Sequence, residues 1–379
     1  MELLNTNKIK RVGWAYPPTI FTRWASTSTL PRLDTGLKSW TMPIHMNQSW
    51  SLALGTVGLY VAANLAQAGA ARAKKLPGRR ALLTWAPIAA MSLVSLWGNH
   101  AEIAIGILFG TSVAMLSLVI GATALAGPVT PAPKNWRRIW PFALLAAVMV
   151  FLVGLHGPVV HFTGALTLAV EGLIVVALWN APAGKEAVAA AGAAGEAKDG
   201  WPWLAGAAAT LLAGAAAIWT MHGKLEFMEF SSRIPPATTA ATLLSAALVL
   251  PAMRRGRELS RTKQSWLAVT SGVGVVLLNL CALLPLVAMW PYAAAKWPQV
   301  TRHGQTMWPK VLWHWHANPA QLLAFPYTVW RVDAVALILL SLLILPTAAE
   351  KWDLDGEEGF VLVAGYCAYL VVVMGVTLF

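Results

Sequence analysis

The sequence predicts an all-α integral membrane protein with about ten transmembrane helices. Hydrophobic residues make up 57% of the 379 residues and charged residues only 12%, with a mean hydropathy of +0.59. Soluble domains carry about twice that share of charge. The apolar residues are grouped in runs of roughly 17 to 25, the length at which a helix crosses a bilayer. These runs lack the short alternating pattern of a membrane β-barrel.

The apolar runs place the expected helices along the chain. In chain order, we expect helices at residues 47–71, 81–97, 101–126, 139–154, 161–179, 201–220, 236–253, 264–292, 332–347 and 358–379. Cys281 and Cys367 both fall within such runs, which indicates small buried side chains rather than a disulfide framework. The residues before the first run contain no apolar core of the signal-peptide type, so we expect an arm of the mature protein there.

Positive charge is distributed unevenly between the two sides of the predicted topology. The formal net charge is +12, and Lys and Arg are concentrated in the connections that follow the odd-numbered helices. Because basic loops stay in the cytoplasm, we expect a multi-pass protein of the inner, or cytoplasmic, membrane with both termini outside. We therefore attribute the positive charge to the cytoplasmic loops and expect no nucleic-acid binding.

Two parts of the chain repeat the same spacing of proline and glycine. Pro87 precedes Gly110 by 23 residues, and Pro251 precedes Gly274 by the same 23. We therefore expect two five-helix repeats, and the odd number of helices makes the second repeat inverted relative to the first. The predicted parts are an arm (1–46), a first repeat (47–180), a linker (181–200) and a second repeat (201–379) with a long outer connection (293–331).

The prolines and glycines also predict local features of these helices. A proline inside a membrane helix removes a backbone hydrogen bond, so helix breaks are expected at Pro87 and Pro251 and near Gly110 and Gly274. Glycine and hydroxyl residues beside such breaks permit close helix packing. In transporters built from inverted repeats, the binding site lies at the midplane, where the repeats meet.

At these residues the sequence resembles the calcium/cation antiporter superfamily, which includes the sodium/calcium exchangers. That family has two inverted repeats, each with a helix similar to GTSLPEL followed by one similar to GSNIFN, and its paired acidic residues bind the ions. The matching stretches here are SLVSLWG after Pro87, AIGILFGTSVAMLSLVIGATALAGPV, IPPATTAATLLSAALVLPAM and EEGFVLVAGYCAYL. The resemblance covers residues 47–379 apart from 293–331 and implies an antiporter-like fold.

Carried over to this sequence, the family's ion-binding positions lack their carboxylates. The glutamate that follows each proline corresponds to Ile88 and Ala252. The other motif positions correspond to Thr84 and Trp85, Leu248 and Val249, Thr111 and Val275, and Met115 and Asn279. The oxygen donors that remain, with the hydroxyls close to them, are Thr84, Thr111, Ser112, Thr242, Ser245 and Asn279. We interpret this set as the remnant of an ion site.

A site of hydroxyl and amide oxygens alone disfavours calcium. Calcium takes roughly six to eight oxygen ligands, and a dication in an apolar interior costs on the order of tens of kcal/mol without compensating carboxylates. Hydroxyls and helix carbonyls can hold a monovalent cation. Glu171, halfway along the fifth predicted helix, is either a buried or paired acid or a relay for a proton or cation. The other acidic residues fall in tails, in connections or, like Asp333, at helix ends.

The arm 1–46 and the connection 293–331 contain many tryptophans and are expected on the outer face, where they would contact protein partners. His314 and His316 lie in the connection, in the stretch WHWH. They are either interfacial, partner-contacting residues or ligands of a metal or haem. The absence of a CxxCH motif excludes covalent c-type haem, and no other cofactor is predicted. The remainder of the protein is expected to contact the lipid bilayer.

No hydrolase, P-loop or dinucleotide-binding motif occurs in a fitting context, so the chain is not expected to be an enzyme. The predicted function is a structural or accessory subunit of a membrane complex, with an antiporter-like fold and a degenerate ion site. The alternative is a secondary transporter of a monovalent cation or proton, less favourably of calcium, that uses Thr111, Ser112, Asn279 and Glu171.

Overall fold

The computed structural model describes the chain over several separate ranges. These are residues 48–72, 77–97, 100–129, 139–155, 172, 235–288, 290, 332–348 and 354–378. Within them the regular structure is helical, apart from one isolated bridge between Val129 and Leu354. The arm 1–46, the linker 181–200, the connection 293–331 and, Gly172 excepted, the predicted helices 161–179 and 201–220 lie outside the described residues.

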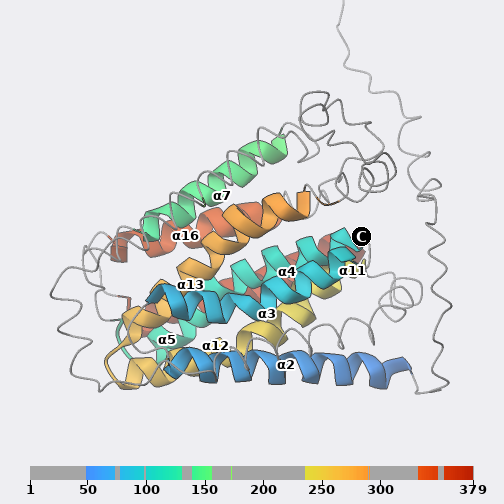
Figure 1. Ribbon diagram of the computed structural model, residues 1–379. Helices are drawn as coiled ribbons and strands as arrows, with labels where there is room; N and C mark the ends of the chain where they lie inside the picture. The colour runs from blue at the N-terminus through green and yellow to red at the C-terminus, as the bar shows by residue number, and fades with distance from the viewer. Residues whose placement is uncertain are drawn as a thin grey trace, which may run out of the picture. The chain divides into compact units, whose positions relative to one another are not determined.

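The first half of the chain contributes four helices to the described structure (Figure 1). The first two are α2 (Gln48–Arg72) and α3 (Pro77–Trp97). The third is continuous and consists of α4 (Ala101–Ala114), the π-helix η1 (Met115–Val119) and α5 (Ile120–Ala126). The fourth is α7 (Trp140–Leu155). Each coincides with a helix that the apolar runs predict.

The second half contributes two further interrupted helices and two regular ones. One continuous helix consists of α11 (Pro236–Thr239), the π-helix η2 (Ala240–Leu244) and α12 (Ser245–Arg261). The next begins with α13 (Ser265–Leu277) and passes through the π-helix η3 (Leu278–Leu283). The last two are α16 (Ala334–Ala348) and α17 (Gly356–Leu378). α12 continues to Arg261, beyond its predicted end at residue 253.

Five helices among the described residues are long and apolar enough to cross a membrane. They span Arg80–Trp97, Ala101–Ala126, Pro236–Arg261, Ser265–Ala288 and Gly356–Gly375. Shorter apolar helices cover Trp140–Leu152 and Ala334–Thr347. The prediction of an α-helical integral membrane protein is therefore confirmed.

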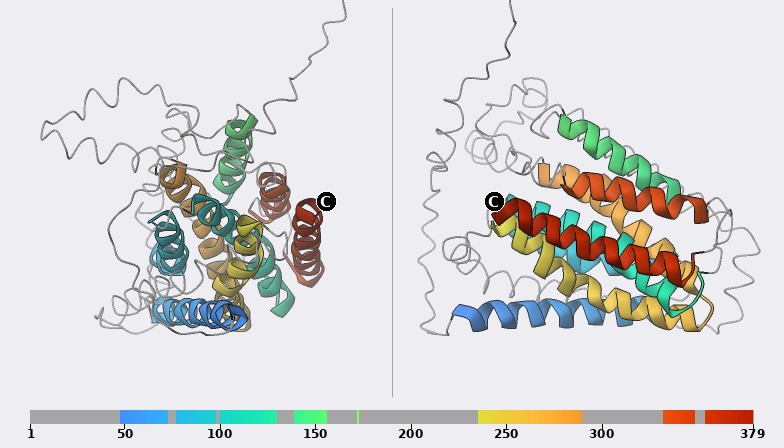
Figure 2. Two further views of the ribbon diagram at one scale, coloured as in Figure 1. Left: turned by 90° about the vertical axis from the view of Figure 1, so that its right-hand side faces the viewer. Right: turned by 180° about the vertical axis from the view of Figure 1, so that it is seen from behind.

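The helix at 101–126 lies at the centre of the packing. In its apolar 18-residue window, 94% of the residues are buried inside the protein, against only 28% in the corresponding window of α17. α4 packs against α3, η2 and α12, and α5 packs against α12 and α17 (Figure 2). α17 exposes apolar side chains such as Phe360 and Val371. Lipid covers such a surface at no cost, so α17 occupies the edge of this packing and α4 its centre.

Two glycines bring the backbone of α4 against the helix that contains η2. A Cβ added at Gly110 would collide with the carbonyl oxygen of Ala241 and the hydroxyl of Ser245. A Cβ added at Gly106 would collide with the carbonyl oxygen of Ala237. Membrane helices associate through such small residues, because lipid provides no hydrophobic force between them. The GTS stretch of α4 is therefore held against a neighbouring backbone.

The helices continue through the positions at which the sequence predicted breaks. Pro87 lies inside α3, Gly110 inside α4, Pro251 inside α12 and Gly274 inside α13. A proline removes one backbone bond, and packing on neighbouring helices keeps the helix continuous. The irregular segments are instead η1, η2 and η3, whose bonds reach five residues along the chain. The inverted relation of the two halves stays a prediction.

Candidate functional site

Asn279 on η3 forms the centre of a buried polar cluster. Its side chain is 0% exposed. Its Nδ2 donates to Thr111 Oγ1 at 3.0 Å, to Ser112 Oγ at 3.0 Å and to Leu108 O at 3.2 Å. An amide nitrogen carries two hydrogens, so three acceptors share them. The structure thus brings together Thr111, Ser112 and Asn279, which the sequence selected as candidate ion ligands.

Trp85 determines which end of the Asn279 amide faces the cluster. The indole Nε1 of Trp85 donates to Asn279 Oδ1 at 3.0 Å. An indole nitrogen can only donate, so it requires the amide oxygen as its partner. The amide nitrogen must then face Thr111 and Ser112. The orientation of the amide therefore follows from the hydrogen-bond network itself.

The two hydroxyls of the cluster use their own hydrogens within α4. Thr111 Oγ1 donates to Ile107 O at 2.6 Å, and Ser112 Oγ donates to Leu108 O at 2.7 Å. Hydroxyl residues in membrane helices commonly bond the carbonyl one turn back. Their oxygens can still accept hydrogen bonds, and each accepts one from the amide of Asn279. Every polar atom of this cluster therefore has a partner supplied by the chain.

The other predicted oxygen donors lie outside the cluster. Ser245 Oγ donates to Ala240 O at 2.8 Å and lies 3.4 Å from Ile107 O, the carbonyl that Thr111 also bonds. Thr242 Oγ1 donates to Thr238 O at 2.8 Å within its own helix. Thr84 accepts a hydrogen bond from Gln67 Nε2 at 2.9 Å. Ser245 is thus one carbonyl away, while Thr84 and Thr242 serve other contacts.

The positions at which the family resemblance places glutamates hold apolar side chains. Ile88 is 0% exposed and belongs to the hydrophobic core, and Ala252 is 7% exposed. Among the described residues, no carboxylate bonds the Asn279 cluster and no group of His, Cys, Asp and Glu could hold a metal. Glu171, His314 and His316 lie outside the described residues.

Some polar residues with unusual positions were not selected from the sequence. Asp333, which the sequence placed at a helix end, is only 3% exposed and faces the phenol of Tyr369 on α17. Arg80 and Arg255, from two different helices, line one pocket. The arginines follow no motif of the family, and a position at a helix end does not indicate burial. Only the packing of distant helices reveals these residues.

Comparison with known proteins agrees with this fold. Residues 80–181 match the family model described as sodium/calcium exchanger protein. The structure of the sodium-calcium exchanger NCX_Mj soaked with 2.5 mM Na+ and 0.1 mM Ca2+ is similar, with a TM-score of 0.54 and 14% identity over 86% of this chain and 97% of that chain. Native YfkE is similar with a TM-score of 0.58 and 15% identity over 86% of this chain and 92% of that chain. No curated protein matches the sequence.

The family match lies in the first half of the chain, whereas the structural similarity covers most of it. Because the sequence identities are only 14% and 15%, the structural similarity establishes the fold alone. The chain therefore has the fold of the sodium/calcium exchangers, and the resemblance to the calcium/cation antiporter superfamily that its sequence predicts is confirmed.

Proposed function

We propose that this membrane protein of sodium/calcium exchanger-like fold carries a closed, degenerate ion site and serves as a structural or accessory subunit of a membrane complex. One observation carries the proposal of a closed site. The Asn279 amide nitrogen lies among three oxygen atoms, those of Leu108, Thr111 and Ser112. An N–H donor of partial positive charge takes the place that a cation would need among these oxygens.

The charge of the cluster supports the same conclusion. A bound cation requires oxygen lone pairs, and calcium usually requires carboxylates among roughly six to eight ligands. Ile88 and Ala252 supply none, and the lone pairs of Thr111 and Ser112 already accept hydrogens from Asn279. A cation could enter only if the amide turned, and this would set its NH2 group against the Trp85 N–H.

The proposed subunit role rests on the composition of segments outside the described residues. The arm 1–46 and the connection 293–331 are rich in tryptophan, a residue enriched at protein interfaces and at the membrane surface. On the predicted topology both lie on the outer face of the inner membrane, as do the termini. These segments would bind protein partners, and the protein would have no enzymatic activity.

A second candidate function is secondary transport of a monovalent cation or proton, with calcium antiport less favoured. The fold favours it, since NCX_Mj is a sodium-calcium exchanger and aligns over 86% of this chain. In this case Thr111, Ser112 and Asn279 would hold the cation after rotation of the amide, and Glu171 would act as a relay.

Native purification and a flux assay together test the two candidates. The protein is purified in mild detergent, and its size and co-purifying chains are recorded. It is then placed in proteoliposomes, where sodium, potassium, proton and calcium fluxes are measured. A larger assembly and no flux above empty liposomes are expected. A lone chain of 40.5 kDa with a flux that Thr111→Ala and Asn279→Ala abolish would establish the transporter instead.

A further inference from the structure

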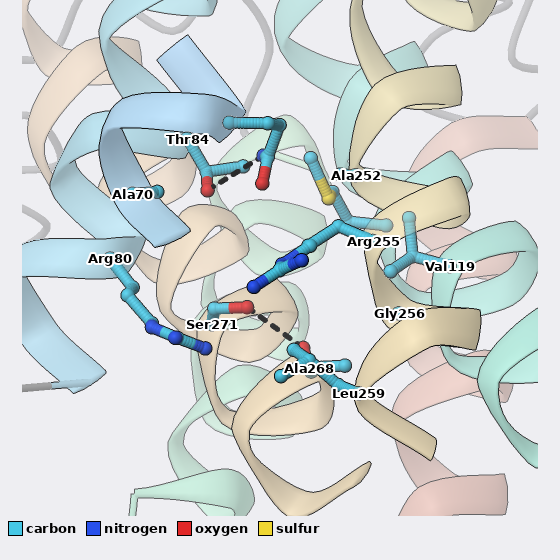
Figure 3. A pocket seen from close by; sticks show the side chains of 12 residues that line it. Ala70, Arg80, Thr84, Val119, Ala252, Arg255, Gly256, Leu259, Ala268 and Ser271 are labelled. Atoms are coloured by element: carbon cyan, nitrogen blue, oxygen red, sulfur yellow. Dashed lines mark hydrogen bonds between the residues drawn. The ribbon is translucent and has the colours of Figure 1, made fainter. Parts of the chain in front are cut away.

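A pocket separate from the Asn279 cluster lies between α2, α3, η1, α12 and α13 (Figure 3). Arg80 of α3 and Arg255 of α12 both line it, and their guanidinium groups point into the same space. Gln67, Thr84 and Ser271 add polar atoms to its lining. Two positive side chains from different helices therefore converge on one pocket.

The positive charge of this pocket is only partly compensated. Arg80 is 7% exposed, and its Nε is buried without a hydrogen-bond partner. The Nε of Arg255 is buried in the same way, while its Nη1 pairs with Glu258 Oε2 at 2.5 Å. In the described parts of the chain, Arg80 has no carboxylate partner. The pocket thus holds two guanidinium groups and a single neighbouring carboxylate.

Such an arrangement is suited to an anion. Removing a guanidinium from water is costly unless an acceptor replaces its hydration, and two like charges that converge repel each other. The planar fork of arginine matches two oxygens of a phosphate group, and bonds of this kind are strong. Thr84 accepts from Gln67 at 2.9 Å and keeps its own hydroxyl hydrogen as a donor.

We propose that this pocket binds an oxyanion of the phosphate class, held by Arg80 and Arg255 with Thr84 and Gln67 as further donors. Two sources supply this chemistry, free inorganic phosphate and the phosphate of an anionic lipid headgroup. Arg80 begins the membrane span of α3, and Arg255 follows the predicted apolar run 236–253. Both arginines thus lie at the end of the apolar part of their helix, where either source can reach them.

The pocket also includes a position that the family uses for the opposite charge. Ala252, which the resemblance aligns with the second glutamate, lines it. Where the family places an acid, this chain has an apolar residue beside two arginines. The anion site does not involve the Asn279 cluster, because Trp85 and Asn279 do not line the pocket.

Thermal unfolding of the purified full-length protein tests the proposal. The Tm is titrated with inorganic phosphate in detergent and compared with chloride at equal ionic strength. Arg80→Gln and Arg255→Gln should each raise the dissociation constant for phosphate about tenfold or more, since each removes charge-assisted hydrogen bonds. Arg257→Gln is the matched control, because Arg257 is an exposed arginine of the same helix outside this pocket, and it should bind like the wild type.

The second part of the experiment measures lipid binding. Native mass spectrometry would count phosphatidylglycerol molecules that stay bound to the wild type, to both pocket variants and to Arg257→Gln. Retention that the pocket variants lose identifies the lipid headgroup, and a phosphate-dependent Tm without lipid retention identifies the free anion. If Arg80→Gln does not fold, Arg80→Lys replaces it, because lysine keeps the positive charge but lacks the planar guanidinium group. Equal responses of the wild type and both pocket variants in both parts would overturn the proposal.

Discussion

The indole Nε1 of Trp85 donates to Oδ1 of Asn279 at 3.0 Å and joins α3 to η3 across 194 positions of the chain. This bond decides whether the nitrogen or the oxygen of the Asn279 amide lies beside Thr111 and Ser112. With the indole in place, Thr111 and Ser112 face an N–H donor. Without it, the amide could turn and face them with its oxygen. The proposed closed form of the site would thus depend on a residue that is itself no ion ligand.

Trp85→Phe should lower the free energy of unfolding by about 1 to 2 kcal/mol. The substitution keeps an aromatic ring in the packing but leaves the buried Asn279 oxygen without its donor. Thermal unfolding in detergent, with denaturation in sodium dodecyl sulfate as a second measurement, gives the change. Trp97→Phe is the control, because Trp97 lies on the same helix and is 80% exposed. A loss as large in the control would show that the hydrogen bond is not the cause.

Gly110→Ala should destabilise the protein by about 1 to 3 kcal/mol, because the added methyl group overpacks a tight contact. It would collide with Ala241 O and Ser245 Oγ and push α4 away from η2. Gly58→Ala is a matched control within α2, since nothing lies within 4 Å of a Cβ there. The control should be neutral or gain up to about 1 kcal/mol from helix propensity. Equal effects of the two substitutions on the Tm would contradict the close approach of α4 to the helix that contains η2.

The helices could be predicted from the sequence because the membrane leaves few alternatives. A bilayer requires long apolar runs with internally satisfied backbones, and such runs are visible without any knowledge of packing. The predicted end of α12 at residue 253 was wrong, because the apolar run ends before the helix does. Its last turns are polar and project beyond the apolar run, where Arg254 and Arg255 pair with Glu258 along the helix. Helix formation there does not depend on lipid.

The candidate site could be predicted only in part. Alignment with the family motifs selected Thr111 and Asn279, and the structure places them 3.0 Å apart. The partner of Asn279 was not found, because a tryptophan at a former motif position gives no signal of its hydrogen bond. The π-helices and the Arg80–Arg255 pocket depend on how distant helices pack. No local pattern in the sequence carries that information.

The proposal of a closed site also implies how it could be opened again. Asn279→Asp keeps the shape of the side chain and replaces the amide nitrogen with a carboxylate oxygen. That oxygen would face Leu108 O, Thr111 Oγ1 and Ser112 Oγ. Together with these three, the new carboxylate oxygen would make a set of four oxygens with a negative charge, which is a set of ligands suited to a monovalent cation.

We therefore expect Asn279→Asp to be less stable than the wild type by about 3 to 5 kcal/mol without sodium, because a buried charge lacks a partner. Sodium should recover part of this loss, whereas the wild type should unfold at the same temperature in sodium and in choline chloride. Asn279→Ala controls for lost packing, since it removes the amide but offers no charge, and it should not respond to sodium. Sodium-specific stabilisation of the wild type that Thr111→Ala abolishes would contradict a closed site. Such stabilisation would mean that sodium binds at Thr111, which requires the amide nitrogen of Asn279 to move away.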